Sequence, residues 1–167
     1  VGILSGYGLT EAPILTLVAV DDPDQKKSDT EGRPMPGVDL RIVTLDGRVA
    51  EPGEEGEIRA KAPQLMNGYL DAALDAEAFD EDGYFRSGDL GVQDADGYVT
   101  ITGRLKDIII RKGENISAKE VEDLLFTHPK VADVAVIGLP DAASGERACA
   151  VVGLNDTADP PTADEMR

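Results

Sequence analysis

Three Asp-Gly pairs in the first hundred residues restrict what this chain can fold into. They are Asp46-Gly47, Asp82-Gly83 and Asp96-Gly97, and each has the residues that a tight turn between antiparallel strands favours. Short apolar segments flank them, and residues 38–45 alternate apolar and polar side chains, as a half-buried strand does. Many short strands at close spacing predict a small β-barrel or sandwich rather than parallel βαβ units.

The pattern changes after Arg104. Residues 107–110 predict a strand, and residues 115–116 its return after a turn. Ser117 and Glu120 then form an S-x-x-E capping box, which predicts the start of a helix that Pro129 ends. Two apolar segments, 131–139 and 147–154, predict further strands. A second unit of mixed α and β structure therefore follows the first.

Charge and composition exclude several classes of protein. The 167 residues carry 33 acidic and 16 basic side chains, a net charge of -17, which opposes binding to nucleic acid or to an anionic membrane surface. A solubility role explains this charge without any special partner. The single cysteine, Cys149, permits no disulfide framework or cysteine zinc site within one chain, and the single histidine, His128, gives little support to a hydrolase.

The segment 6–11, with the sequence GYGLTE, combines three groups that a nucleotide site uses. The ring of Tyr7 can stack on a base, the hydroxyl of Thr10 can contact a phosphate oxygen, and the carboxylate of Glu11 can hold a divalent cation. We expect this segment to be a loop, because two glycines flank the aromatic residue. An ordinary turn with a packed tyrosine explains the same residues.

Two further residues have the chemistry to hold a sugar. Asp89, which we place at the end of a strand, can accept hydrogen bonds from both hydroxyls of a ribose, or it can cap its own turn. Arg104 can bind the same sugar or a phosphate, or it can form a surface ion pair.

Taken together, four motifs in this order resemble the adenylate-forming superfamily, which includes acyl-CoA synthetases, firefly-type luciferases and the adenylation domains of peptide synthetases. The similar segments are 6–11, 56–58 with 68–69, 84–89, and 103–107 with 113–116. The resemblance covers nearly the whole chain. The sequence RKGENI at 111–116 is most similar to the ligases that join fatty or related acids to coenzyme A.

The resemblance implies an ATP or AMP site. Tyr7 would stack on adenine, Gly8 would lie against the nucleotide, and Thr10 would contact the phosphate. Asp89 would accept both ribose hydroxyls, and Arg104 would contact the ribose as well.

The resemblance also implies catalytic and mobile parts. Glu11 would hold Mg²⁺, and Thr10 and Glu11 would act together in catalysis. Lys106 would be the hinge about which a small domain rotates between two half-reactions. Gly113 would lie on the side that receives the pantetheine of coenzyme A.

The implied fold is of the α+β class. Residues 1–30 would end a large α/β domain, residues 31–104 would form a β-barrel subdomain, and residues 105–167 would begin a mobile, truncated C-terminal α+β domain. A phosphate loop and a catalytic lysine that the superfamily has are absent from the chain. We therefore expect a C-terminal-region fragment that is inactive alone.

The expected function is that of an AMP-forming acid–CoA ligase in fatty-acid or lipid metabolism. It would activate a small carboxylic acid with ATP and Mg²⁺ as acyl-AMP and transfer the acyl group to coenzyme A. The chain has no apolar run of about 18 residues and no signal peptide, so we expect a cytoplasmic protein without a membrane span. The alternatives are an acyl-AMP or carrier-loading ligase, and a non-catalytic remnant that binds nucleotide.

Overall fold

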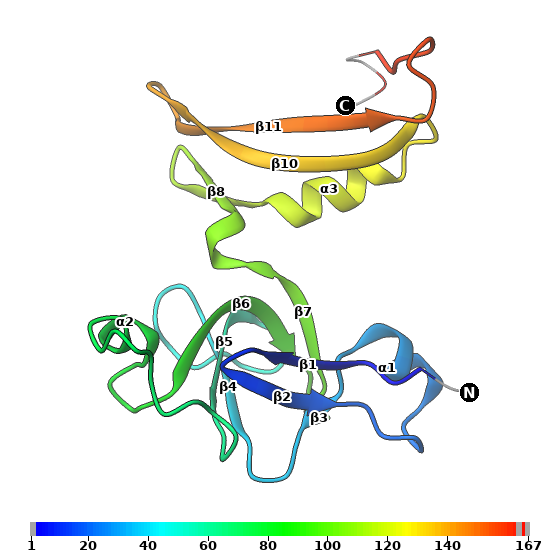
Figure 1. Ribbon diagram of the computed structural model, residues 1–167. Coiled ribbons are helices and arrows are strands. Elements are labelled where there is room, and N and C mark those ends of the chain that lie inside the picture. The colour runs from blue at the N-terminus through cyan, green and yellow to red at the C-terminus, as the bar shows by residue number, and fades with distance from the viewer. Residues whose placement is uncertain (1–2, 163–164, 166–167) are drawn as a thin grey trace. The chain divides into compact units, whose positions relative to one another are not determined.

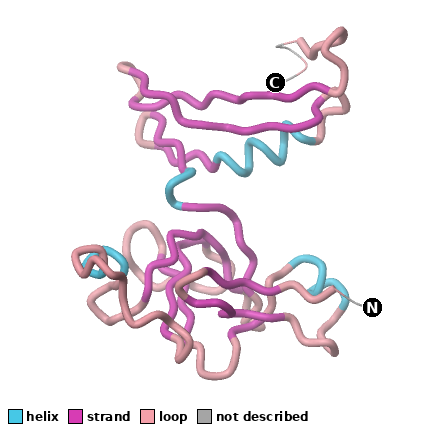
Figure 2. Tube along the Cα trace, in the orientation of Figure 1, coloured by secondary structure: helices cyan, strands magenta, loops and turns pink. Residues whose placement is uncertain are grey.

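The chain forms two compact units, which divide between Thr102 and Gly103. The computed structural model describes residues 3–162 and 165. The α+β class predicted from the sequence is confirmed, since most of the elements are strands of antiparallel sheets and a few short helices connect them (Figures 1 and 2).

The first unit begins with a three-stranded antiparallel sheet. Its strands, in spatial order, are β1 (Gly6–Leu9), β2 (Ala12–Leu17) and β3 (Arg33–Pro34), and the short helix α1 (Asp24–Asp29) connects β2 to β3. Our prediction that residues 6–11 form a loop was therefore wrong. Residues 6–9 pair with β2, and only Thr10 and Glu11 make the turn. Apolar residues of β1 and β2 pack in the same buried cluster, which favours this pairing.

A four-stranded sheet completes the first unit. Its strands β4 (Asp39–Val43), β5 (Glu55–Lys61), β6 (Phe85–Gln93) and β7 (Val99–Arg104) are neighbours in chain order, with α2 (Asp75–Ala78) in the connection between β5 and β6. The Asp-Gly turns are confirmed. Their glycines, Gly47, Gly83 and Gly97, all have positive φ, between 80° and 88°, which is the conformation that a residue with a side chain avoids.

The two sheets share one apolar interior. Ala12 and Leu15 of β2 pack on Ala60 of β5, while Ile42, Ile58 and Val99 form a second buried cluster. The ring of Tyr7 packs against both clusters. Neither sheet closes on itself among the described residues, which agrees with the sandwich that our prediction named beside the β-barrel.

A network of ion pairs connects β4, β5 and the turn before β6. The carboxylate of Asp80 accepts hydrogen bonds from Arg41 (2.6 Å) and Arg59 (3.1 Å), and Arg59 also donates to Glu57 at 2.7 Å. Burial would raise the pKa of Asp80, but the hydrogen bonds from the Tyr84 amide and the two guanidinium groups outweigh burial and lower this pKa to about 2.

The second unit contains a four-stranded sheet with the spatial order β10-β11-β8-β9. After a 3₁₀ turn, η1 (Leu105–Asp107), come β8 (Ile108–Arg111), β9 (Glu114–Ser117), α3 (Ala118–Phe126), β10 (Val131–Asp141) and β11 (Gly145–Leu154). Helix α3 packs on β10 through a buried cluster of Ile109, Ala118 and Val136 (Figure 1).

The helix signal read from the sequence is confirmed in position. The Oγ of Ser117 accepts a hydrogen bond from the amide of Glu120 at 3.3 Å, and the helix starts at the next residue, Ala118. No helix within residues 3–162 combines the length and the apolar character that crossing a bilayer requires.

The depressed pKa of Asp80 predicts a pH-dependent contribution to stability. A carboxylate whose pKa falls from its ordinary 3.8 to about 2 on folding stabilises the fold fully above pH 3.8 and loses this effect as the pH falls through about 2. We expect Asp80→Asn to lower the free energy of unfolding at pH 7 by about 2 kcal/mol. This deficit relative to the unchanged chain should shrink as the pH falls from about 4 to 2.

Urea unfolding followed by tyrosine fluorescence measures this effect in the first unit alone, because all four tyrosines lie there. The control is Asp82→Asn, which removes the exposed partner of the same Arg41 and should cost at most about 1 kcal/mol. A deficit for Asp80→Asn that is the same at every pH would contradict this account.

Candidate functional site

The hairpin of β1 and β2 presents the residues of the first motif. Gly8 lies where the two strands approach closely, because a Cβ there would be 2.1 Å from the carbonyl oxygen of Pro13. The register between the strands also shifts between Tyr7 and Leu9. Only glycine fits this position, and the shift sets the turn on which Thr10 is exposed and Glu11 is half-buried.

Tyr7 and Asp89 lie 82 residues apart in the sequence and are in direct contact in the fold. The Tyr7 hydroxyl donates a hydrogen bond to Oδ2 of Asp89 at 2.8 Å. The fold thus brings together the residue expected to hold adenine and the residue expected to hold ribose. Both side chains are half-buried, which leaves each of them partly accessible to a ligand.

The sequence predicted that Asp89 lies at the end of a strand, and this prediction was wrong. Asp89 lies inside the nine-residue strand β6, at a place where the register with β5 shifts. The strand predicted from the sequence ended before Ser87, because Ser87 and Gly88 are typical turn residues. In the structure these residues form an irregularity within one continuous strand.

Glu11 has a partner that the sequence analysis did not name. The Tyr69 hydroxyl donates to Oε1 of Glu11 at 2.9 Å, and the Met66 amide donates to the Glu11 carbonyl at 2.8 Å. Burial raises the pKa of Tyr69, and its hydrogen bond to Glu11 raises it further. Tyr69 is itself held through its amide, which donates to Asp75 at 2.9 Å. The signal for Tyr69 was present, since it ends the second motif.

The chemistry of Glu11 fits one kind of metal ion binding. Among the described residues, no group of three or more His, Cys, Asp or Glu side chains is arranged to hold a metal. A single carboxylate beside a phosphate site suits Mg²⁺, which keeps several waters and is held by one or two carboxylates and substrate phosphates. The residues therefore fit a cation shared with a phosphate and not a cage made by the protein alone.

Arg104, Lys106 and Gly113 all belong to the second unit. Arg104 is the exposed last residue of β7, and Lys106 is the exposed middle residue of η1. Gly113 follows Lys112 in the turn between β8 and β9, and both residues have positive φ, 84° and 53°. This is the backbone of a two-residue hairpin turn, which by itself requires glycine or a similar residue.

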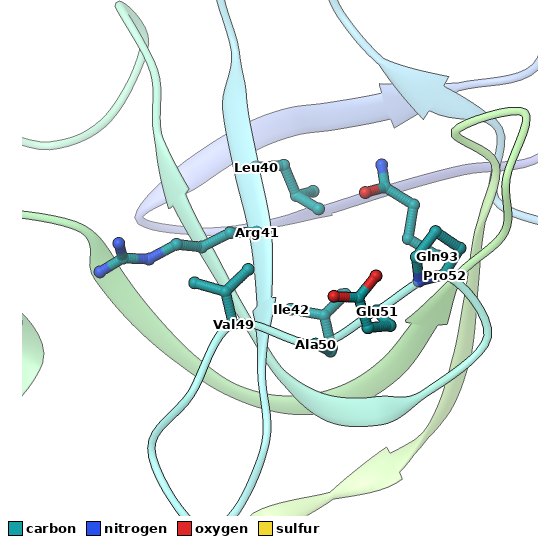
Figure 3. A pocket seen from close by; sticks show the side chains of 8 residues that line it. All are labelled: Leu40, Arg41, Ile42, Val49, Ala50, Glu51, Pro52 and Gln93. Carbon is teal, nitrogen blue, oxygen red and sulfur yellow. The ribbon is translucent and has the colours of Figure 1, made fainter.

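The lining of two cavities includes neither Tyr7 nor Asp89. One of about 130 Å³ lies beside β4 in the first unit, and Figure 3 shows the guanidinium of Arg41 turned away from the others that line it. The other, of about 260 Å³, lies in the second unit. Lys106 is the one predicted site residue on its lining, together with residues of β8, β10 and β11.

Comparisons with known proteins agree with the motifs. Residues 1–70 match the family model described as AMP-binding enzyme, and residues 120–167 match the model described as AMP-binding enzyme C-terminal domain. The medium-chain fatty-acid–CoA ligase of Escherichia coli (strain K12) is 45% identical over 153 residues, which are 91% of this chain and 27% of that protein.

The name of a second relative gives a different activity. The salicyl-AMP ligase / salicyl-S-ArCP synthetase of Mycobacterium tuberculosis (strain ATCC 25618 / H37Rv) is 43% identical over 153 residues, 90% of this chain and 27% of that protein. Among solved structures, ATP-bound MatB from Rhodopseudomonas palustris matches 98% of this chain and 32% of its own, with a TM-score of 0.87 and 34% identity. The chain thus spans about a quarter to a third of each of these proteins.

The contact between Tyr7 and Asp89 predicts that the two side chains are coupled in stability. We expect the combined effect of Tyr7→Phe and Asp89→Ala on the free energy of unfolding to be smaller than the sum of the single effects by about 1 kcal/mol, the worth of one hydrogen bond. Urea unfolding of the two single variants and the double variant measures this coupling. The control combines Tyr69→Phe with Asp89→Ala, because the Tyr69 hydroxyl donates to Glu11 and not to Asp89. The effects of these two changes on the free energy of unfolding should be additive. Additive effects for Tyr7 and Asp89 would show that the contact is not made.

Proposed function

The chain belongs to the adenylate-forming family of AMP-binding enzymes, and from this premise we propose that it is part of an acid–CoA ligase. Such an enzyme joins a carboxylic acid to ATP, which gives acyl-AMP and pyrophosphate, and then transfers the acyl group to the thiol of coenzyme A. The observation that carries the proposal is the contact between Tyr7 and Asp89, because it assembles two motifs of the nucleotide site. The polypeptide that carries this segment, with any further sequence of its own, is called the whole protein below.

In this proposal residues of the first unit bind the nucleotide, together with Arg104 at the end of β7. The ring of Tyr7 lies against adenine, and the carboxylate of Asp89 accepts the ribose hydroxyls. The Tyr7 hydroxyl donates to one oxygen of that carboxylate. The exposed Thr10 contacts the phosphate, Gly8 lets the backbone of the hairpin lie close to the nucleotide, and Arg104 adds a cationic contact to the ribose.

Glu11 would hold the Mg²⁺ that accompanies ATP. Bound there, the cation would supply charge that offsets the phosphate oxygens. The chain's own contribution is to fix the direction of the carboxylate, because the Tyr69 hydroxyl takes up Oε1. Thr10 and Glu11 adjoin in the same turn, so a phosphate oxygen and its cation would be held side by side.

The second unit would serve the transfer to the thiol. Lys106 lies in a single 3₁₀ turn next to the division between the units, which suits a hinge that absorbs a change of backbone angles. Gly113 lies in an open turn where a Cβ would meet no atom within 4 Å. Such a turn leaves room for the pantetheine arm.

The acyl substrate is proposed to be a fatty or related acid, with a role in lipid metabolism in the cytoplasm. The similarity to a medium-chain fatty-acid–CoA ligase supports a fatty or related acid. The relative named as a salicyl-AMP ligase and salicyl-S-ArCP synthetase supports a second candidate, a ligase that loads a carrier protein. Acyl-CoA formed from free coenzyme A would favour the first candidate, and acyl transfer only to a carrier would favour the second.

We further propose the finer division made from the sequence. Residues 1–30 would complete a large nucleotide- and acyl-binding domain, residues 31–104 its β-rich subdomain, and residues 105–167 the start of the mobile domain. All of these boundaries stay predictions.

Pyrophosphate exchange tests the proposed function. We expect the whole protein to exchange labelled pyrophosphate into ATP only when a carboxylic acid is present. The 167-residue chain alone should stay at background, since it spans about a quarter of the length of its ligase relatives. Exchange absent from the whole protein with a broad panel of acids would favour a non-catalytic binding module. Clear exchange by the chain alone would contradict its expected inactivity.

The hinge assignment predicts an uneven effect of Lys106→Pro in the whole protein. Proline fixes φ near -65°, so the rotation is impaired, and we expect thioester formation to fall by at least tenfold more than acyl-AMP formation. Single-turnover assays of each half-reaction measure the two rates. The control is Lys106→Ala, which removes the charge and keeps the backbone free. Equal loss of both half-reactions in Lys106→Pro would contradict the hinge.

A further inference from the structure

Strand β6 contains a bulge at the residue expected to hold ribose. Glu57 pairs with Leu90, and Arg59 pairs with Arg86. Between these two pairs β5 has one residue, Ile58, whereas β6 has three, Ser87, Gly88 and Asp89. Such a bulge interrupts the ladder of backbone hydrogen bonds and directs side chains away from their regular positions.

Side chains replace the hydrogen bonds that the bulge removes. The Ser87 hydroxyl donates to the Ile58 carbonyl at 2.6 Å and accepts from the Asp89 amide at 3.0 Å. The Gly88 amide donates to Oε1 of Glu57 at 3.3 Å. Buried backbone groups without a partner are costly, so these contacts decide whether the bulge keeps one conformation.

The acceptor on β5 is a buried charge with a fixed direction. Glu57 is only 6% exposed, and its other oxygen, Oε2, accepts from Nε of Arg59 at 2.7 Å. Arg59 is held in turn by Asp80. A carboxylate with partners on both oxygens cannot turn freely, and as a charged acceptor it binds an amide more strongly than a neutral one does.

Gly88 permits this arrangement. Its φ is 72°, a conformation that side chains disfavour, and a Cβ built there would meet no atom within 4 Å. The position therefore needs glycine for its backbone angles and not for space.

We propose that Ser87 and Glu57 are positioning residues for Asp89: they hold the bulge in the one conformation that sets the Asp89 carboxylate beside the Tyr7 hydroxyl. Neither residue needs to touch the nucleotide. The link to nucleotide binding rests on the proposed function, in which Asp89 accepts the ribose hydroxyls. The link to the bulge rests on the geometry alone.

Amide hydrogen exchange on the 167-residue chain tests the geometric half. In Ser87→Ala the Asp89 amide loses its acceptor and should exchange about tenfold faster. In Glu57→Gln the acceptor of the Gly88 amide loses its charge, and that amide should also exchange about tenfold faster. The amides of Ile58 and Ala60 should keep their protection. Glu55→Gln is the matched control, an exposed carboxylate on the same strand, and it should change neither amide.

Discrimination between ATP and 2′-deoxy-ATP by the whole protein tests the positioning half. If Asp89 holds the ribose, the unchanged protein should favour ATP in kcat/KM, and Asp89→Ala should abolish most of that preference. Ser87→Ala should reduce the preference by about tenfold, toward the value of Asp89→Ala. Ser87→Thr, which keeps the hydroxyl, should restore it.

Each outcome decides a separate point. Faster local exchange together with a lost preference supports the proposal. Unchanged exchange at Gly88 and Asp89 overturns the account of the bulge. Faster exchange with an unchanged preference, both nucleotides losing rate equally, overturns the positioning role and leaves a purely structural one. No activity of the unchanged protein with either nucleotide would refute the proposed function, while the exchange result would still decide the geometric half.

Discussion

The hydrogen bond between the Tyr7 hydroxyl and the Asp89 carboxylate is the interaction on which the proposed nucleotide site depends. It joins the β1–β2 hairpin to strand β6, and so it connects the two sheets of the first unit. Tyr7 can reach Asp89 because its ring packs against the apolar clusters of both sheets. Apolar packing and the hydrogen bond thus both position the side chain of Tyr7. A change in the packing would therefore disturb the hydrogen bond, and the reverse also holds.

Much of the fold could be predicted from local chemistry. The Asp-Gly turns and the Ser117 cap are set by residues a few positions apart, and both lie where the sequence placed them. The hairpin at residues 6–11 was missed because its two glycines are typical of a loop, although the strand that it pairs with follows directly. The place of Asp89 inside β6 was missed because Ser87 and Gly88 are typical turn residues. The contact of Tyr69 was missed because its bond to Glu11 spans 58 residues.

The glycines of the motifs show why a motif alone does not identify a ligand contact. Gly8 is required by the carbonyl of Pro13, and Gly113 by the positive φ of a hairpin turn. Each has a sufficient reason in the backbone of the chain itself. Their proposed roles toward nucleotide and pantetheine therefore add to a structural requirement that would exist without any ligand.

The connection between β5 and β6 is anchored at both ends and contains an exposed stretch between them. Near its start, Met66 and Tyr69 bond to Glu11, and near its end Asp80 bonds to Arg41 and Arg59. All residues from 70 to 74 are exposed. Exposed loop tips tolerate insertion and are open to proteases, so this stretch can vary in length or carry a fluorescent label without displacing the carboxylates on either side. Residues 70–74 are therefore a suitable place to attach a probe to the first unit without disturbing the neighbouring contact of Tyr69 with Glu11.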